Sequence, residues 1–193
     1  MGKNMIIAQS GGPSPAINAS PSGAVARAMA SAEIGPVYGA VHGLQGMLDR
    51  RIINLSEQMK TAKDFELLTH TPAMALGSCR YKLPKDANDI CNQVLQILRD
   101  YDIGYFFYIG GNDSMDTVAR LSAFVAGRGE EIRGVGMPKT VDNDLPGTDH
   151  TPGFASAAKY VAASIAEIAR DSSVYDMFSV IVVEIMGRNA GWL

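Results

Sequence analysis

The sequence predicts an α/β protein in which helices cover both faces of a mostly parallel sheet. Several apolar runs have the length of a strand, including residues 5–8, 105–109 and 178–184. Uninterrupted runs of this kind are typical of strands that are buried on both faces. Glycine-rich or proline-rich loops follow most of these runs, and segments with helical spacing follow those loops. This alternation indicates a three-layer, Rossmann-like architecture.

The elements are expected in a regular order along the chain. A strand at 5–8 leads through a loop at 10–15 into an alanine-rich helix at 16–30. The remaining elements are expected as strands at 37–41 and 51–55, a helix at about 86–101, a strand at 105–109, a helix at 115–126, a strand at 132–137, a helix at about 151–170 and a strand at 178–184. Ligands of such sheets bind beyond the carboxyl ends of the strands. The loops at that edge are expected at 10–15, 110–114, 138–144 and 186–191.

Length and composition favour one globular domain over residues 1–193. The chain is 47% hydrophobic and 19% charged, and its net charge of −3 comes without a cluster of lysines and arginines. It therefore lacks the basic footprint of a nucleic-acid-binding protein. The apolar runs are too short for a membrane span, and the four apolar residues after Asn4 are too few for a signal peptide. A cytoplasmic location without membrane association is expected.

Two of the loops are suited to binding phosphate groups. Residues 10–14 and 110–114 place glycine N–H groups at the start of a helix, where the backbone is unobstructed and the helix favours an anion. Gly12, Gly111 and Ser114 are candidate phosphate contacts, and the Asp113 carboxylate can hold Mg²⁺. The structural alternative is that the glycines form ordinary turns and that Asp113 or Ser114 caps the helix.

The loop at 138–144 brings a lysine, a hydroxyl group and two carboxylates together. Asp142 can accept a proton from an attacking alcohol, and Lys139 can neutralise charge on a phosphoryl group. Arg80 lies in a loop ahead of the helix at 86–101 and can clamp a phosphate, although a solvated surface arginine explains the same residue equally well. Arg188, after the last predicted strand, can also face an anion.

Four segments in order, Gly11-Gly12, 110–114, 138–144 with 147–149, and 186–191, resemble the phosphofructokinase family over essentially the whole chain. The resemblance implies that a phosphoryl group is transferred to the 1-hydroxyl of fructose 6-phosphate.

The roles of individual residues follow from this resemblance. Asp142 is expected to be the proton acceptor, and Thr140 and Asp144 are expected to position the sugar. Three further residues, Met186, Gly187 and Arg188, are expected to contact the sugar phosphate. Gly12 is expected to face the phosphoryl donor.

Two positions bear on the identity of the donor. ATP-dependent members of the family typically carry glycine in place of Asp113 and Lys139, whereas pyrophosphate-dependent members typically carry this aspartate and this lysine. An aspartate repels the α-phosphate of a nucleotide, and a lysine attracts a compact diphosphate. Pyrophosphate is therefore the expected donor, and an ATP-dependent enzyme is the alternative. Asn112 stands where the family usually has a magnesium-binding aspartate, so Asn112 and Asp113 are both candidate ligands of Mg²⁺.

Family members continue well beyond the segment at 186–191. The resemblance therefore implies that residues 1–193 are the donor-binding, amino-terminal portion of an enzyme, without turnover on their own. It also implies a homo-oligomer whose sugar-phosphate site borrows residues from a neighbour. A non-catalytic or regulatory member is a further alternative, which the neutral Asn112 favours.

Overall fold

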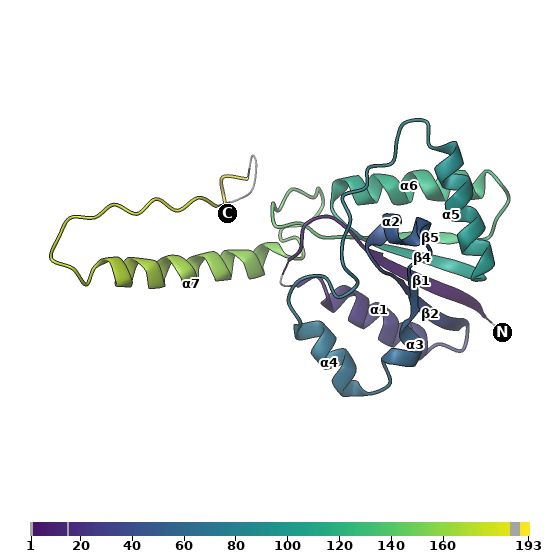
Figure 1. Ribbon diagram of the computed structural model, residues 1–193, viewed down its shortest axis with the longest axis horizontal. Coiled ribbons are helices and arrows are strands. Elements are labelled where there is room, and N and C mark those ends of the chain that lie inside the picture. The colour runs from purple at the N-terminus through teal and green to yellow at the C-terminus, as the bar shows by residue number, and fades with distance from the viewer. Residues whose placement is uncertain (1, 15, 186–189) are drawn as a thin grey trace. The chain divides into compact units, whose positions relative to one another are not determined.

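The computed structural model describes residues 2–14, 16–185 and 190–193 of the chain (Figure 1). Contacts divide the chain into two compact units, Met1–Lys139 and Thr140–Leu193. The first unit contains all five strands of the described sheet, and the second contains one long helix.

The sheet of the first unit is mostly parallel, as the sequence predicts. Its strand order is β3-β2-β1-β4-β5. The four parallel strands are β1 (Lys3–Gln9), β2 (Ile34–Ala40), β4 (Ile103–Gly110) and β5 (Arg133–Pro138). The short β3 (Ile52–Asn54) runs antiparallel to β2 at one edge. Because β1, β4 and β5 are adjacent and parallel, their carboxyl ends lie along one edge of the sheet.

Helices cover both faces of this sheet (Figure 1). One face packs against α2 (Gly43–Leu48), α5 (Asn88–Asp100) and α6 (Asn112–Ala126). The other packs against α1 (Ala19–Met29), α3 (Leu55–Gln58) and α4 (Ala62–His70). Side chains alternate along β1, so that Ile6 joins the first core and Met5 and Ile7 join the second. The predicted three-layer architecture is confirmed.

The helices differ from the prediction mainly at their ends. α6 begins at Asn112 rather than at 115, so Asn112, Asp113 and Ser114 form its first turn. The short helices α2, α3 and α4 were not predicted. A capping box at the start of α4, in which the Thr61 and Asp64 side chains each accept from the other's backbone N–H, is the sequence signal that could have found that helix.

The second unit contains α7 (Phe154–Ser172), which confirms the predicted helix at about 151–170. The predicted strand at 178–184 is wrong: described residues 173–185 contain no strand, and Phe178 and Val182 are 94% and 88% exposed. A strand needs a hydrogen-bonded neighbour. The described part of this unit offers only a single parallel bridge, between Thr140 and Gly153.

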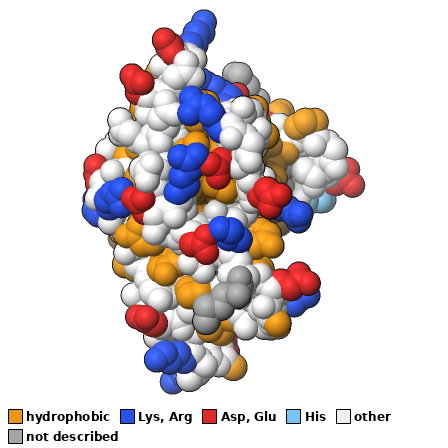
Figure 2. Space-filling model, turned by 90° about the vertical axis from the view of Figure 1, so that its right-hand side faces the viewer, with side chains coloured by type: hydrophobic (Ala, Val, Ile, Leu, Met, Phe, Trp, Pro, Cys, Tyr) orange, Lys and Arg blue, Asp and Glu red, His pale blue; other side chains and the backbone are white. Residues whose placement is uncertain are grey.

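The surface of the molecule mixes charges of both signs. On the face that Figure 2 shows, lysine and arginine side chains are interspersed with aspartates and glutamates. Among the helices of the described residues, none has the length and apolar character that a membrane span requires.

Candidate functional site

Three of the four predicted functional loops begin at the carboxyl edge of the sheet, in the first unit. Residues 10–14 follow β1, residues 111–114 follow β4, and Lys139 follows β5. The fourth loop contains Met186, Gly187 and Arg188, which lie outside the described residues, so their predicted roles stay predictions.

The first glycine loop, residues 10–14, is held by the chain near Cys79. The Gly11 N–H donates to the Cys79 carbonyl oxygen at 3.1 Å, and the Ser78 hydroxyl donates to the Gly11 carbonyl oxygen at 2.5 Å. Gly11 has a φ of +80°, a conformation that favours glycine. A Cβ at Gly12 would meet no atom within 4 Å. The loop is therefore fixed on one side and has room at Gly12 for a ligand.

The second glycine loop, residues 110–114, runs directly into α6. Gly111 is the N-cap residue of α6, so the N-cap position supplies no side-chain hydrogen bond to the first N–H groups of the helix. Asn112 and Asp113 are exposed in the first turn, whereas Ser114 is buried. The N-terminus of a 15-residue helix therefore faces this loop, and such an end favours an anion.

Lys139 links the two glycine loops. Its backbone N–H donates to the Gly110 carbonyl oxygen at 2.9 Å, and its ammonium group donates to the Gly12 carbonyl oxygen at 2.5 Å. A Cβ at Gly11 would lie only 3.3 Å from the Lys139 Nζ atom. The residue is 7% exposed, so a largely buried cation lies against the first glycine loop, while the backbone of the same residue is bonded to the second.

The loop that carries Arg80 and Lys82 is fixed to α6. The Arg120 guanidinium donates to the carbonyl oxygens of Leu83, Pro84 and Lys85. Lys82 Nζ lies 3.5 Å from an Asp113 carboxylate oxygen, and both side chains are mostly exposed. Arg80 is exposed and follows Cys79, whose carbonyl contacts Gly11.

The loop after Lys139 belongs to the second unit and is held by its own hydrogen bonds. The Thr151 hydroxyl donates to the Thr140 carbonyl oxygen at 2.7 Å, and the Asp142 N–H donates to the Thr140 hydroxyl at 3.0 Å. Asn143 has a φ of +52°. Its side chain donates to the carbonyl oxygen of Asp149 at 3.0 Å and accepts from the Thr151 N–H at 2.8 Å.

This bonding bends the loop around Asn143. Its neighbours, the half-buried Asp142 and the exposed Asp144, are the two carboxylates that the sequence singles out. Asn143 itself was not among the predicted site residues. The residue type is the sequence signal that could have pointed to this bend, because asparagine tolerates positive φ better than most residues.

The described residues contain no group of three histidine, cysteine, aspartate or glutamate side chains that could hold a metal ion. Asn112 and Asp113 bring one amide oxygen and one carboxylate to the start of α6. A hard cation needs six or more oxygen ligands, so these two residues fit a metal only if phosphate oxygens and water supply the rest.

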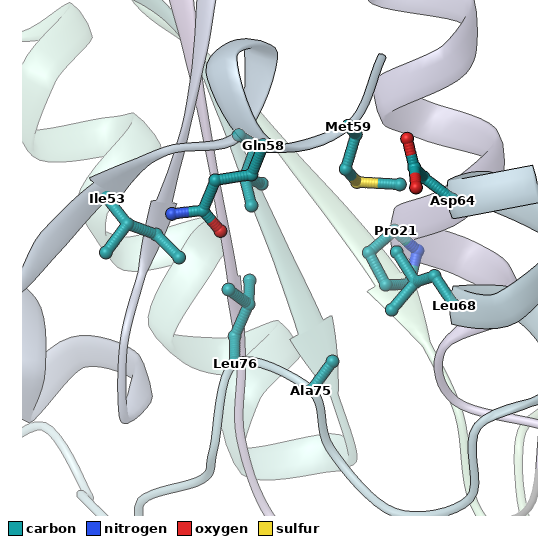
Figure 3. Close-up of a pocket in the computed structure, with 9 residues that line it drawn as sticks. Pro21, Ile53, Gln58, Met59, Asp64, Leu68, Ala75 and Leu76 are labelled. Atoms are coloured by element: carbon teal, nitrogen blue, oxygen red, sulfur yellow. The ribbon is translucent and has the colours of Figure 1, made fainter. Parts of the chain in front are cut away.

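A cavity of about 170 Å³ in the first unit lies among β3, α1, α3 and α4 (Figure 3). Its lining is mainly apolar, with Ile53, Met59 and Leu76 among the residues. The Asp64 carboxylate at its rim accepts backbone N–H bonds from Lys60 and Thr61, which lower its pKa. The cavity therefore lacks groups suited to an anionic donor.

Comparisons with known proteins agree on one family. The family model described as Phosphofructokinase matches residues 4–193. The pyrophosphate–fructose 6-phosphate 1-phosphotransferase of Rhodospirillum rubrum is 41% identical over 189 residues, which are 98% of this chain and 45% of that protein. The protein of the same name from Halomonas elongata is 43% identical over an alignment 196 positions long with its gaps, which covers 98% of this chain and 46% of that protein.

A solved structure is similar as well. The crystal structure of the pyrophosphate-dependent phosphofructokinase from Nitrosospira multiformis is 40% identical, with a TM-score of 0.81, and the match covers 88% of this chain and 42% of that one. The chain thus spans about half the length of the curated relatives it matches.

Proposed function

This chain belongs to the phosphofructokinase family, and on that premise we propose that it forms the donor-binding portion of a pyrophosphate-dependent phosphofructokinase. The reaction is the reversible transfer of a phosphoryl group from pyrophosphate to the 1-hydroxyl of fructose 6-phosphate, a step of glycolysis. The whole enzyme is a cytoplasmic homo-oligomer in this proposal, with residues 1–193 as a single α/β domain.

The position of Lys139 carries the proposal. Its ammonium group lies against the Gly11 and Gly12 backbone, and its backbone is bonded to Gly110, so one residue contacts both glycine loops. Pyrophosphate concentrates several negative charges on two phosphorus centres, and a largely buried ammonium interacts with such a group much more strongly than a solvated one. Gly12, Gly111 and Ser114 supply the surrounding contacts, and Arg80 adds a second cation.

Asp113 supports pyrophosphate over ATP as the donor. It lies exposed in the first turn of α6, beside the loop that binds phosphate in this proposal. A carboxylate there repels the α-phosphate of a nucleotide, whereas a diphosphate ends before that position. The relatives named above are pyrophosphate-dependent by name.

In the second unit, we assign proton transfer to Asp142. Its carboxylate accepts the proton of the 1-hydroxyl as that oxygen attacks phosphorus, and the phosphate released from the donor leaves as an anion. Thr140 and Asp144 position the sugar. Met186, Gly187 and Arg188 complete the contacts to the sugar phosphate.

Mg²⁺ belongs to the proposal as a companion of the donor. When bound, it neutralises charge on the phosphoryl oxygens. Asp113 and Asn112 are the residues of this chain that would hold it, with the phosphate oxygens and water as the other ligands.

Calorimetric titration of the chain with magnesium pyrophosphate and with magnesium ATP tests the donor assignment. We expect measurable affinity for pyrophosphate and much weaker affinity for ATP. Replacing both Asp113 and Lys139 by glycine should weaken pyrophosphate binding at least tenfold. The control replaces Lys85 and Asp86 by glycine, an equal charge change in an exposed loop. Preference for ATP would overturn the assignment in favour of an ATP-dependent enzyme. Equal effects of the two double variants would overturn the roles of Asp113 and Lys139 in choosing the donor.

The catalytic role needs a longer protein. We expect residues 1–193 alone to show no phosphofructokinase turnover, because they span only about half the length of the relatives they match. A chimera that adds the remaining portion of a pyrophosphate-dependent relative should be active, and Asp142→Asn should lower its rate by about 10²–10⁴. Asp171→Asn, at the end of α7, is the control. An unchanged rate in Asp142→Asn, or an inactive chimera that binds both substrates, would favour the non-catalytic alternative.

A further inference from the structure

A chain of three hydroxyl groups connects the two glycine loops to each other and to β4. It consists of Ser114, Ser10 and Tyr108, and is called the hydroxyl chain below. The Ser10 and Ser114 Oγ atoms are 2.5 Å apart, and the Ser10 side chain lies close enough to the Tyr108 hydroxyl to influence the pKa of that phenol. Ser10 is 3% exposed, Ser114 is 7% exposed and Tyr108 is 1% exposed. The hydroxyl chain therefore joins the end of β1, the first turn of α6 and β4 in a region largely shielded from bulk water.

The strand register brings these groups together. β1 and β4 pair with Ala8 opposite Tyr108 and Gln9 opposite Ile109, so Ser10 emerges from β1 beside Gly110. A Cβ at Gly110 would lie 2.1 Å from the Ser114 Oγ atom and 2.7 Å from the Ser10 Oγ atom. Only glycine leaves room for the two hydroxyls to meet at this position, because real Cβ atoms do not approach so closely.

Tyr108 connects the hydroxyl chain to two other segments. Its hydroxyl oxygen accepts the Leu44 N–H at 3.4 Å and lies 3.7 Å from the Cys79 Sγ atom. Cys79 in turn holds the first glycine loop through the bond from the Gly11 N–H to its carbonyl oxygen. Burial raises the pKa of the Tyr108 phenol far above its usual range, so the group stays neutral and acts through geometry rather than charge.

Each hydroxyl group of the hydroxyl chain can donate one hydrogen bond and can also accept one. The bond between Ser10 and Ser114 can therefore run in either direction, without movement of any heavy atom. When Ser10 donates, the Ser114 proton is free to point at a ligand in the second glycine loop. Buried groups linked in this way act as a unit, and removing one member takes a partner from its neighbour.

We propose that the hydroxyl chain sets the spacing of the two glycine loops for a diphosphate, so that Ser10 and Tyr108 are positioning residues of the donor site. This inference rests on the proposed donor-binding function. Neither residue touches the donor: Ser10 acts through Ser114 and through the backbone of Gly11, and Tyr108 acts through Ser10. Phosphate recognition by backbone N–H groups depends on their placement to within a fraction of an ångström, which a loosened loop does not keep.

Hydrogen–deuterium exchange and calorimetry on the full chain test the inference together. Tyr108→Phe and Ser10→Ala each remove one hydroxyl. In both, we expect faster exchange of the amides at 10–14 and 110–114, and an affinity for magnesium pyrophosphate that is about fivefold weaker, which is the usual effect of one lost hydrogen bond. Because the hydroxyls act as a unit, the double variant should bind no more weakly than the weaker single variant.

Two controls match these substitutions. Tyr38→Phe removes a hydroxyl from β2, where the Tyr38 ring packs edge-on against Tyr101. Ser22→Ala breaks a buried bond from the Ser22 hydroxyl to the Phe65 carbonyl oxygen, on the other face of the sheet. Both should leave exchange in the glycine loops and pyrophosphate affinity unchanged, even if they lower the melting temperature.

The outcomes separate the inference from the proposed function. Unchanged loop exchange in both Tyr108→Phe and Ser10→Ala overturns the inference, as do additive losses of affinity in the double variant. If the unmodified chain binds no pyrophosphate, the proposed donor fails, while the exchange data still decide whether the hydroxyl chain positions the loops. If Tyr108→Phe does not fold, Ser10→Ala and its control give the same decision.

Discussion

Gly11→Ala is the substitution whose effect the structure defines most sharply. Gly11 has a φ of +80°, and an added Cβ would lie 3.3 Å from the Lys139 Nζ atom. The strained backbone costs about 1–2 kcal/mol of stability for a residue other than glycine. In a protein of this size that cost lowers the melting temperature by roughly 2–8 °C.

The contact with Lys139 adds an effect on binding. The ammonium group must move by a few tenths of an ångström to relieve the contact. For an ammonium about 3 Å from a phosphate oxygen, a shift of about 0.4 Å changes the Coulomb energy by about 0.6 kcal/mol at an effective dielectric constant of about 20. That energy corresponds to an about threefold change in affinity for each phosphate charge close to the ammonium group. We therefore expect the affinity for magnesium pyrophosphate to fall by about three- to tenfold.

Gly129→Ala is the matched control. Gly129 has a φ of +74°, and a Cβ there would meet nothing within 4 Å. The two variants should lose similar stability in thermal unfolding, while only Gly11→Ala should lose affinity in calorimetry. Pyrophosphate binding by Gly11→Ala at the original affinity, or an equal loss in Gly129→Ala, would refute the reasoning about Lys139.

Two further predictions concern Arg120 and Cys91, which lie in the first unit outside the glycine loops. Arg120→Gln removes the three bonds to the loop at 83–85, so trypsin should cut after Arg80, Lys82 or Lys85 several times faster. Arg128→Gln, just beyond the end of the same helix, should not change the cleavage rate. Burial raises the pKa of the Cys91 thiol; iodoacetamide at pH 8 should therefore label Cys91 only after unfolding. Since the folded pKa lies above the unfolded one, this thiol's contribution to stability is present below the unfolded pKa and is lost as pH rises through the folded pKa. Cys91→Ala should lose less stability at alkaline pH, and an unchanged alkaline loss would contradict this assignment.

The sheet could be predicted because its central strands carry their own signal. β1 and β4 consist largely of apolar residues, and burial on both faces of a parallel sheet requires that composition. The start of α6 was placed three residues late, because Asn112, Asp113 and Ser114 are typical both of loops and of the first turn of a helix. The segment at 178–184 has the composition of a strand, but pairing partners decide whether a strand forms.

The position of the candidate site was predictable where local sequence determines it. Glycines ahead of a helix and a lysine after a strand favour a phosphate site, and phosphate binding itself stays a prediction. The hydroxyl chain was not predictable in the same way. Ser10 and Ser114 are separated by 104 positions, and they meet only because of the register between β1 and β4. Serine and tyrosine are also common in strands and loops for unrelated reasons.

The exposed run after α7 has a consequence for handling the protein. Between Phe178 and Val183 the sequence reads FSVIVV, with no proline, glycine or charged side chain, and Val180 and Val182 are 72% and 88% exposed. Six-residue segments of this composition readily stack into cross-β fibrils when their backbone is available. We expect concentrated solutions of the chain to form thioflavin-positive fibrils after a lag. Val182→Lys should lengthen that lag, because a charge in the middle of the segment opposes stacking.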